Sequence, residues 1–305
     1  MTTRNYEAIP EDNARKIIDL NHKQSSHKPK IAIVSHYTTD KDNLGFIDLV
    51  TKNHIKYARM HGYDYYFRNG TISDKYFWPD GKNRTFKLGL YWQKIQASKE
   101  LLEMKKDGKP LYDYVMWLDT DAIFTNLSLT LEKIINQAPK DTYFFIGQDM
   151  SSCVNAGVFI TKNSDKGRAF INAVDSSFEI YKMTKYPEQL AMSDLVYGYI
   201  DQKQIDELHN KPLEIHEFVK KVEKHKCTKT ISGIQVLSMK LLNGAYPWPD
   251  AQWVSWDKNS LIAHFLSISG PRLERYLKTL LGCLEQNNYE NRNRCNPYNL
   301  NIVLR

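Results

Sequence analysis

The most informative segment of this 305-residue chain is Tyr114-Val-Met-Trp-Leu-Asp-Thr-Asp-Ala-Ile-Phe-Thr-Asn126. It begins with five apolar residues in a row, a pattern typical of a short buried strand. The strand leads directly into Asp119 and Asp121, and residues two apart in extended backbone point to the same side. Ligands of open α/β sheets bind beyond the carboxyl ends of the strands. The stretch therefore predicts that both carboxylates face a ligand.

Two clustered carboxylates suit a hard divalent cation, Mg²⁺ or Mn²⁺, which keeps open positions for phosphate oxygens. The simpler alternative is a pair of solvated carboxylates at a strand end. Metal-dependent glycosyltransferases use Asp-x-Asp to bridge an ion to a nucleotide-sugar diphosphate, whereas haloacid-dehalogenase-like phosphatases use the first Asp as a nucleophile. The phosphatase motif usually opens its fold and requires a later acidic pair. Here two predicted strands precede Asp119, and no Gly-Asp-x-x-x-Asp follows, so the glycosyltransferase is favoured.

The surrounding sequence predicts alternating strands and helices. Strands are expected at 30–35, 63–68, 112–118, 142–147, 158–162 and 261–266, and helices at 44–62, 84–105, 128–137, 164–181, 187–208 and from 271 onward. This order is typical of an α/β fold with a mostly parallel, Rossmann-like sheet and helices on both faces. We expect a lead-in over 1–29, one catalytic domain over 30–285 and a tail over 286–305.

Composition limits the classes of protein that remain. A chain near 300 residues buries roughly 75% of its unfolded surface, so folding requires neither disulfides nor metal. Its apolar runs are far shorter than the ~18–20 residues of a membrane span, and no apolar targeting region follows Met1. The formal net charge of the chain is +7, but the sequence contains no concentrated block of like charges. Duplex nucleic acid is therefore not the expected partner. A nucleotide diphosphate, an anionic glycan or peripheral contact with a membrane surface would account for the charge.

The four cysteines lie far apart in the sequence, which argues against a zinc ribbon and against a disulfide-rich scaffold. Cys283 and Cys295 would pair in an oxidising compartment, and free thiols are the simpler expectation.

The chain resembles glycosyltransferase family 34, which includes fungal α-galactosyl- and α-mannosyltransferases and plant xyloglucan xylosyltransferases. The segment from Trp117 to Thr125 is similar to the family's Trp-x-Asp-[Ser/Thr]-Asp-Ala-x-Phe-Thr block. Further similar segments follow the family's order: His61-Gly-Tyr-Asp64, Tyr91-Trp-Gln-Lys-Ile95, Asn155-Ala-Gly-Val-Phe159, Glu188-Gln189 and His264-Phe265. The resemblance extends over residues 30–280. After His264 the chain departs from the family, because Leu266-Ser-Ile-Ser-Gly-Pro-Arg272 stands where members often have Gly-Cys.

The resemblance implies a GT-A fold, retention of α-configuration at the donor carbon and a metal site of Asp119, Asp121 and His264. A late strand can return His264 to the carboxylate edge, and its imidazole would complete an oxygen/nitrogen site suited to Mn²⁺. Without the motif order, a structural role for His264 would be the simpler interpretation. The cofactors expected are Mn²⁺ or Mg²⁺ and a nucleotide sugar, with a UDP-sugar favoured over GDP-mannose.

Several other residues are candidates for contacts with the donor. The loop His36-Tyr37-Thr38-Thr39 follows the first strand, where Tyr37 and Thr38 can meet the nucleotide. The remaining candidates are Lys94, Thr120, Gln148, Asp149, Asn155, Gly157, Gly270 and Arg272. A buried structural lysine, a tight turn or an ordinary loop remains the alternative for several of them. The aromatic residues Trp78, Trp248, Trp253 and Trp256 are candidates for sugar platforms, with core packing the better interpretation for at least one.

Glu188 and Gln189 are the candidates for the reacting face. A retaining transfer needs a carboxylate nucleophile, or a front-face route in which the departing phosphate assists the acceptor. Because an amide is a poor nucleophile, Gln189 favours the front-face route, with Glu188 as a supporting charge. The alternatives are a solvated first helical turn and Asp194 of the same predicted helix.

We therefore expect a retaining α-glycosyltransferase that moves a hexose or pentose from a nucleotide sugar to a glycan hydroxyl. A nucleotide-sugar- or carbohydrate-binding protein without catalysis and, after it, a phosphatase are the alternatives. The expected location is the cytoplasm of a microbe or virus, and the alternative is a Golgi protein without its anchor.

Overall fold

The computed structural model describes residues 28–37, 44–70, 72, 74–76, 83–150, 152–222, 227–247, 255–297 and 299–300. Within these ranges the main sheet has the strand order β2-β1-β5-β8-β7-β9. Its strands are β1 (Ile31–Tyr37), β2 (Asp64–Asn69), β5 (Tyr114–Leu118), β7 (Phe144–Gln148), β8 (Val154–Lys162) and β9 (Ile234–Leu237). The strand predicted at the start of the Asp-x-Asp stretch, β5, lies in the interior of this sheet.

All strands of this sheet except β8 run in one direction. Strand β1 pairs in parallel with β2 and β5, and β7 pairs in parallel with β9, whereas β8 is antiparallel to β5 and β7. Residues 149–153, the connection between β7 and β8, are too few for a crossover helix, so the two strands form an antiparallel pair. The predicted mostly parallel sheet is confirmed, but the predicted strand–helix alternation fails at this pair.

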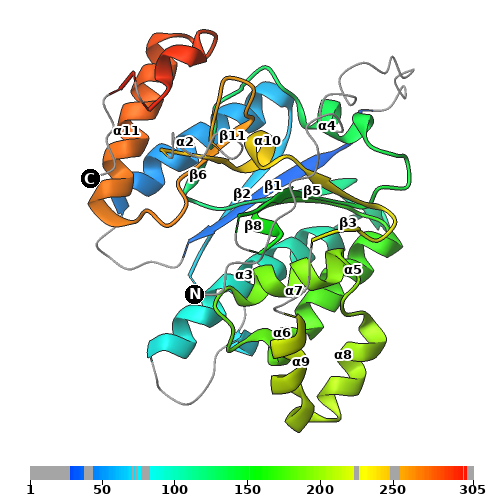
Figure 1. Cartoon of the computed structure of the whole chain (residues 1–305). Coiled ribbons are helices and arrows are strands. Elements are labelled where there is room, and N and C mark those ends of the chain that lie inside the picture. The colour runs from blue at the N-terminus through cyan, green and yellow to red at the C-terminus, as the bar shows by residue number, and fades with distance from the viewer. Residues whose placement is uncertain are drawn as a thin grey trace.

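Helices cover both faces of the sheet, as predicted (Figure 1). One face carries α2 (Leu44–His61), α4 (Leu131–Gln137), α10 (Met239–Asn243) and α11 (Gly270–Gln286). The other carries α3 (Asn83–Glu103), α5 (Asp165–Ser176) and α7 (Pro187–Val196), with α6 (Phe178–Tyr181), α8 (Gln202–His209) and α9 (Ile215–Val222) outside them. The strands supply both cores by alternation: in β1, Ile31 and Ile33 face one core while Ala32 and Val34 face the other.

The single helix predicted over 187–208 is in fact two helices. Gly198 adopts a left-handed conformation (φ +68°) just after α7 and ends it. Asp201 then opens α8 through a capping box with Gln204. The hydrophobic periodicity of the sequence continues across the break, so the pattern alone predicts one helix where the structure has two.

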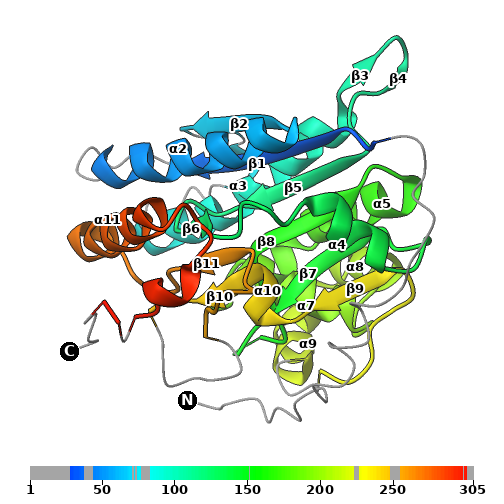
Figure 2. The same ribbon diagram turned by 90° about the horizontal axis from the view of Figure 1, so that it is seen from above.

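A second, smaller sheet has the order β10-β11-β6, formed by β10 (Gly244–Ala245), β11 (Ile262–His264) and β6 (Ala122–Phe124). A hairpin of β3 (Lys105–Lys106) and β4 (Lys109–Pro110) projects from the body of the molecule (Figure 2). Short 3₁₀ helices lie at η2 (Asp74–Tyr76), η3 (Pro212–Glu214) and η4 (Arg292–Cys295). None of the helices in the described ranges is long and apolar enough to cross a membrane.

All four cysteines lie within the described residues, and all are paired. Disulfides join Cys153 to Cys227 and Cys283 to Cys295. The expectation of free thiols is therefore wrong. The second bond confirms the alternative pairing, and it connects the end of α11 to η4. The first bond had no sequence signal, because its cysteines are 74 residues apart.

Candidate metal and donor site

The smaller sheet assembles the three predicted metal ligands. Asp121 immediately precedes β6 and His264 ends β11, and these two strands pair with His264 opposite Ala122. The backbone N–H of Phe265 donates to the carbonyl of Asp121 at 2.8 Å, which closes the pair. Asp119 follows β5 two residues earlier. As a result, one potential ligand atom each from Asp119, Asp121 and His264 lies within 4.8 Å of the others.

The chemistry of this group fits a divalent cation. His264 Nε2 lies 3.1 Å from Asp121 Oδ1, while the side chains of Asp119 and Asp121 remain 27% and 31% exposed and thus open to a ligand. Two carboxylates and an imidazole form an oxygen/nitrogen donor set suited to Mn²⁺. Burial disfavours the imidazolium, but the facing carboxylate of Asp121 outweighs it, so the pKa of His264 is raised. A cation bound to these carboxylates would compete with that proton.

Gly157 leaves the space that this group occupies. A Cβ at Gly157 would lie 2.2 Å from His264 Cε1 and 3.1 Å from Asp119 Oδ2. The Gly157 carbonyl also accepts a hydrogen bond from the Asp119 N–H at 2.9 Å. The close backbone approach predicted for Gly157 is therefore present, but it is directed toward the candidate metal ligands.

Lys94 is a buried cation between the candidate metal ligands and the candidate reacting face. Its Nζ lies 3.3 Å from Asp119 Oδ1 and 3.0 Å from Glu188 Oε1, and it donates to the Ala156 carbonyl at 3.3 Å. Burial opposes its charge, but the two carboxylates outweigh burial and raise the pKa of Lys94. Two roles were expected for Lys94: contact with the diphosphate, or a buried structural cation. In this structure Lys94 contacts two carboxylates, which fits the structural cation.

Glu188 and Gln189, in the first turn of α7, have different surroundings. Glu188 is buried and paired with Lys94, and burial raises the pKa of its carboxyl. Gln189 accepts the Ala156 N–H at 3.0 Å through Oε1, and its Nε2 donates to the hydroxyl of Ser152. The alternative of a solvated first turn is therefore wrong for Glu188, whose carboxylate is held inside the protein.

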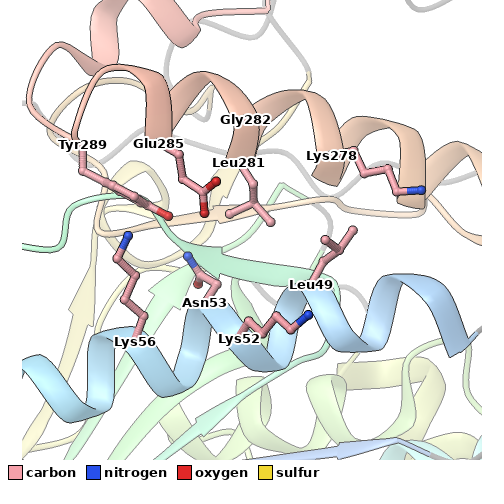
Figure 3. Close-up of a pocket in the computed structure, with 9 residues that line it drawn as sticks. All are labelled: Leu49, Lys52, Asn53, Lys56, Lys278, Leu281, Gly282, Glu285 and Tyr289. Carbon is pink, nitrogen blue, oxygen red and sulfur yellow. The ribbon is translucent and has the colours of Figure 1, made fainter.

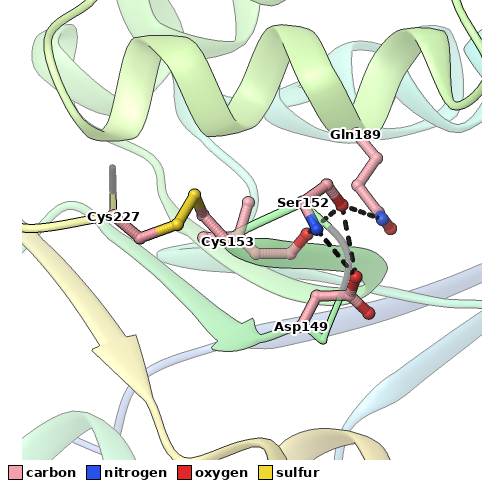
Figure 4. The surroundings of a disulfide bond; sticks show 6 residues. Asp149, Ser152, Cys153, Gln189 and Cys227 are labelled. Atoms are coloured by element: carbon pink, nitrogen blue, oxygen red, sulfur yellow. Dashed lines mark hydrogen bonds between the residues drawn. A yellow bond between two sulfur atoms is a disulfide. The ribbon is translucent and has the colours of Figure 1, made fainter. Parts of the chain in front are cut away.

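The loop between β7 and β8 holds Gln189 through Ser152 (Figure 4). Asp149 receives hydrogen bonds from the N–H and the hydroxyl of Ser152, at 3.2 and 3.3 Å, and from Asn155 Nδ2 at 3.0 Å. The next residue, Cys153, anchors the loop to Cys227. Asp149 and Asn155 were predicted to contact donor hydroxyls. In this structure these two side chains form a hydrogen bond with each other and so help to fix the shape of the loop.

The other predicted donor residues lie on several different elements. Tyr37 ends β1 and packs edge-on against Phe46 at 5.6 Å, Thr120 lies in the turn between the two aspartates, and Gln148 ends β7. Gly270 opens α11 in a left-handed conformation (φ +60°), and the guanidinium of Arg272 lies 5.7 Å from the centre of the Tyr276 ring. Thr38, Trp78, Trp248 and Trp253 lie outside the described residues.

Two candidates have structural partners. Trp256 is buried and donates to Thr125 Oγ1 at 2.8 Å, so core packing is correct for this tryptophan. Asp194 is buried in α7 and accepts a hydrogen bond from the Tyr181 hydroxyl at 2.9 Å. Its position is that of a core carboxylate.

A separate pocket of about 270 Å³ lies between α2 and α11 (Figure 3). Lys52 and Lys56 approach it from α2, and Lys278 and Glu285 approach it from α11. It has no lining residue in common with the candidate metal group.

Sequence reasoning missed two polar residues near the site. Ser152 had no motif around it. Asn243, whose Oδ1 lies 3.0 Å from His264 Nδ1, is 21 residues away in sequence. The one signal for Asn243 is indirect: a histidine that binds metal through one ring nitrogen needs a hydrogen-bond partner for the other.

The chain is similar to known glycosyltransferases in sequence and in fold. Residues 27–139 match the galactosyl transferase GMA12/MNN10 family. An alpha-1,2-galactosyltransferase of Schizosaccharomyces pombe is 23% identical over 251 residues, which cover 72% of this chain and 56% of that protein. Glycosyltransferase 6 of Arabidopsis thaliana is 26% identical over 120 residues, or 37% of this chain and 23% of that protein. The chain spans about half the length of the fungal relatives that it matches.

Among solved structures, the chain is similar to a glycosyltransferase involved in the glycosylation of the major capsid of PBCV-1. The TM-score is 0.54 with 15% identity, and the match covers 82% of this chain and 99% of that one. This likeness concerns the fold, and the predicted GT-A fold is confirmed. The resemblance predicted from the motif series is confirmed as well, because residues 27–139 match the model of the galactosyl transferase GMA12/MNN10 family.

Proposed function

We propose that this protein is a metal-dependent, retaining glycosyltransferase that transfers a sugar, galactose in the first instance, from a UDP-sugar to a hydroxyl of a glycan. The observation that carries the proposal is the convergence of Asp119, Asp121 and His264 at the edge of a GT-A sheet. The match of residues 27–139 to the family model supports transfer chemistry, and the galactosyltransferase activity of the similar fungal protein favours galactose.

Asp119, Asp121 and His264 would hold the divalent ion. When bound, such an ion neutralises the charge that develops on the leaving diphosphate and so lowers the barrier. The exposed fractions of Asp119 and Asp121 leave room for phosphate oxygens beside them. Lys94 keeps Asp119 and Glu188 in place from the protein side.

The reacting face would lie next to Gln189. Its amide is held at both ends, by the Ala156 N–H and the Ser152 hydroxyl, so its orientation is set before substrate binds. Glu188 is turned inward onto Lys94 and is therefore a supporting charge and not a nucleophile. With neither residue placed as a carboxylate nucleophile, we favour the front-face route, in which the departing phosphate assists the acceptor.

The test is calorimetry with UDP, with and without Mn²⁺, followed by a donor screen with UDP-galactose, UDP-glucose, UDP-xylose and GDP-mannose. Wild type is expected to bind UDP only with Mn²⁺, to turn over UDP-galactose fastest and to form an α-linked product. Asp121→Asn should lose Mn²⁺-dependent binding. Asp48→Asn, a matched change at an exposed position on α2, should not. Equal metal-free binding of UDP by wild type and Asp121→Asn would overturn the metal site. Donor binding without any transfer or hydrolysis would indicate a binding protein instead.

A further inference from the structure

Asn243 is attached to the candidate metal site through the backbone that carries His264. It is the last residue of α10 and directly precedes β10, which pairs in parallel with β11 so that Ala245 lies opposite His264. The Tyr246 N–H donates to the His264 carbonyl at 3.0 Å. Asn243 is completely buried, and its Oδ1 faces His264 Nδ1 at 3.0 Å. The amide and the imidazole are therefore held as a pair.

This contact determines which nitrogen of the imidazole is available to a metal. An amide oxygen can only accept a hydrogen bond, so Nδ1 must carry the proton. In the neutral imidazole that a metal requires, the lone pair is then on Nε2, the nitrogen that faces Asp121. Metal-binding histidines almost always have the second ring nitrogen fixed in this way. A neutral acceptor also suits this place, because Asp119, Asp121 and Glu188 already supply three carboxylates to the site.

Stability alone does not explain Asn243. Its Nδ2 is buried and has no hydrogen-bond partner among the described residues. A buried donor without a partner destabilises the folded state, so an apolar residue of similar shape would suit a purely structural position better. The amide is retained at a cost, and the group that benefits from its oxygen is His264.

Gly147 makes room for this amide. It lies in β7, where the register shifts between Ile146 and Gly147. A Cβ at Gly147 would lie 2.6 Å from Asn243 Nδ2, closer than real Cβ contacts come, and the Asn243 side chain would have to move.

We propose that Asn243 is a positioning residue that holds His264 with Nε2 directed to the divalent ion, and that Gly147 provides the space for it. This inference rests on the proposed metal site.

The experiment measures Mn²⁺ affinity by calorimetry with Mn²⁺ alone, without nucleotide, on variants whose thermal melts show that they are folded. Asn243→Leu removes the acceptor and should weaken Mn²⁺ binding about 10–100-fold. Asn243→Asp keeps an acceptor of the same shape and should bind Mn²⁺ at least as tightly as wild type. Gly147→Ala should weaken binding in the same direction as Asn243→Leu. The matched control is Gly282→Ala in α11, where an added Cβ meets nothing within 4 Å and binding should be unchanged.

A double variant sharpens the assignment. If Gly147 acts through Asn243, then Gly147→Ala should add little to the effect of Asn243→Leu, because both changes remove the same contact. Should Asn243→Leu fail to fold, Gly147→Ala and Asn243→Asp carry the test.

Two results would overturn the inference alone: Asn243→Leu binding Mn²⁺ as tightly as wild type, or Asn243→Asp binding as weakly as Asn243→Leu. A wild-type protein that does not bind Mn²⁺, or binds it no better than Asp121→Asn, would instead overturn the metal site and this inference with it.

Discussion

Two clusters of buried charge in this protein look alike and behave in opposite ways. In the candidate site, Lys94 lies between the carboxylates of Asp119 and Glu188. In the second cluster, Asp175 of α5 accepts hydrogen bonds from Lys75 at 2.8 Å, from Lys99 at 2.6 Å and from the hydroxyl of Tyr76 at 2.6 Å. Both contain lysine and buried carboxylate in direct contact.

The balance of charge separates them. In the site, burial raises the pKa of both Asp119 and Glu188, and the single lysine that they share does not offset it. In the second cluster burial would also raise the pKa of Asp175, but its two lysines and its tyrosine outweigh burial, and the pKa is lowered. The site cluster lacks positive charge, and the Asp175 cluster does not. A contact between a buried carboxylate and a lysine therefore does not by itself mark a functional site. A cluster whose negative charge exceeds its positive charge points instead to a cation that binds there.

The largest expected effect comes from neutralising a candidate metal ligand. Asp119→Asn should reduce transfer by about 10²–10³-fold, because the diphosphate loses its counter-charge. Without metal, the Asp119→Asn variant should be at least as stable as metal-free wild type. Burial raises the pKa of the Asp119 carboxyl, so the charged form is unfavourable in the folded protein. Donor consumption and thermal melts measure the two quantities. A large loss of metal-free stability would contradict the comparison.

Removing the shared lysine should produce the largest loss of stability. Lys94→Met leaves the buried Glu188 and the partly exposed Asp119 without their cation, which should lower the free energy of unfolding by about 3–5 kcal/mol in the metal-free protein. Added Mn²⁺ should restore part of it by binding the folded state. Urea unfolding with and without Mn²⁺ measures this. Lys99→Met is the matched control. It should cost less because Lys75 still pairs with Asp175, and it should show no rescue by Mn²⁺.

Asp175→Asn should have the reverse profile of Asp119→Asn. It removes charge-assisted hydrogen bonds that tie η2, α3 and α5 together, so stability should fall by about 2 kcal/mol. Mn²⁺ affinity and transfer by the folded protein should stay at wild-type values. A selective loss of Mn²⁺ affinity without a loss of stability would remove the distinction between the clusters.

The smallest effect is a difference in the sign of pH dependence. The stabilisation from Asp175 is complete above its unfolded pKa, about 3.9, and is lost as pH falls through its lowered native pKa. Glu188 has a raised native pKa, so its contribution to stability falls as pH rises from about 4.3 through that value. The free energy of unfolding should be measured against pH across the acid range for wild type, Asp175→Asn and Glu188→Gln. The two substitutions should change the slope of this dependence in opposite directions, and changes in the same direction would refute the opposite pKa shifts.

Local sequence predicted much of the fold because local patterns specify it. The apolar run of β5, the amphipathic α2 and the glycine-terminated helix ends are visible within windows of a few residues. What was missed depends on contacts between distant residues. Strand β6 is three residues long and is defined by pairing with β11, and the direction of β8 follows from its short connection to β7.

The candidate site divides in the same way. Asp119 and Asp121 follow from one strand end, and the return of His264 follows from motif order. The partners that orient these groups did not follow. Lys94 reaches Asp119 from α3, Ser152 reaches Gln189 across 37 residues, and Asn243 reaches His264 through the smaller sheet. Such contacts leave no periodicity in the sequence.

The positions of the cysteines also have a topological consequence. Asp121 and His264 are separated by 143 residues, and the Cys153–Cys227 bond, which spans 74, lies entirely within that interval. The chain between the two ligands is thus a loop inside a loop. Closing the inner loop first shortens the outer one by about half, and each halving reduces the entropic cost of closure by about 0.6 kcal/mol. Oxidation of these cysteines during folding would therefore make it slightly easier for the two ends of the candidate metal site to meet.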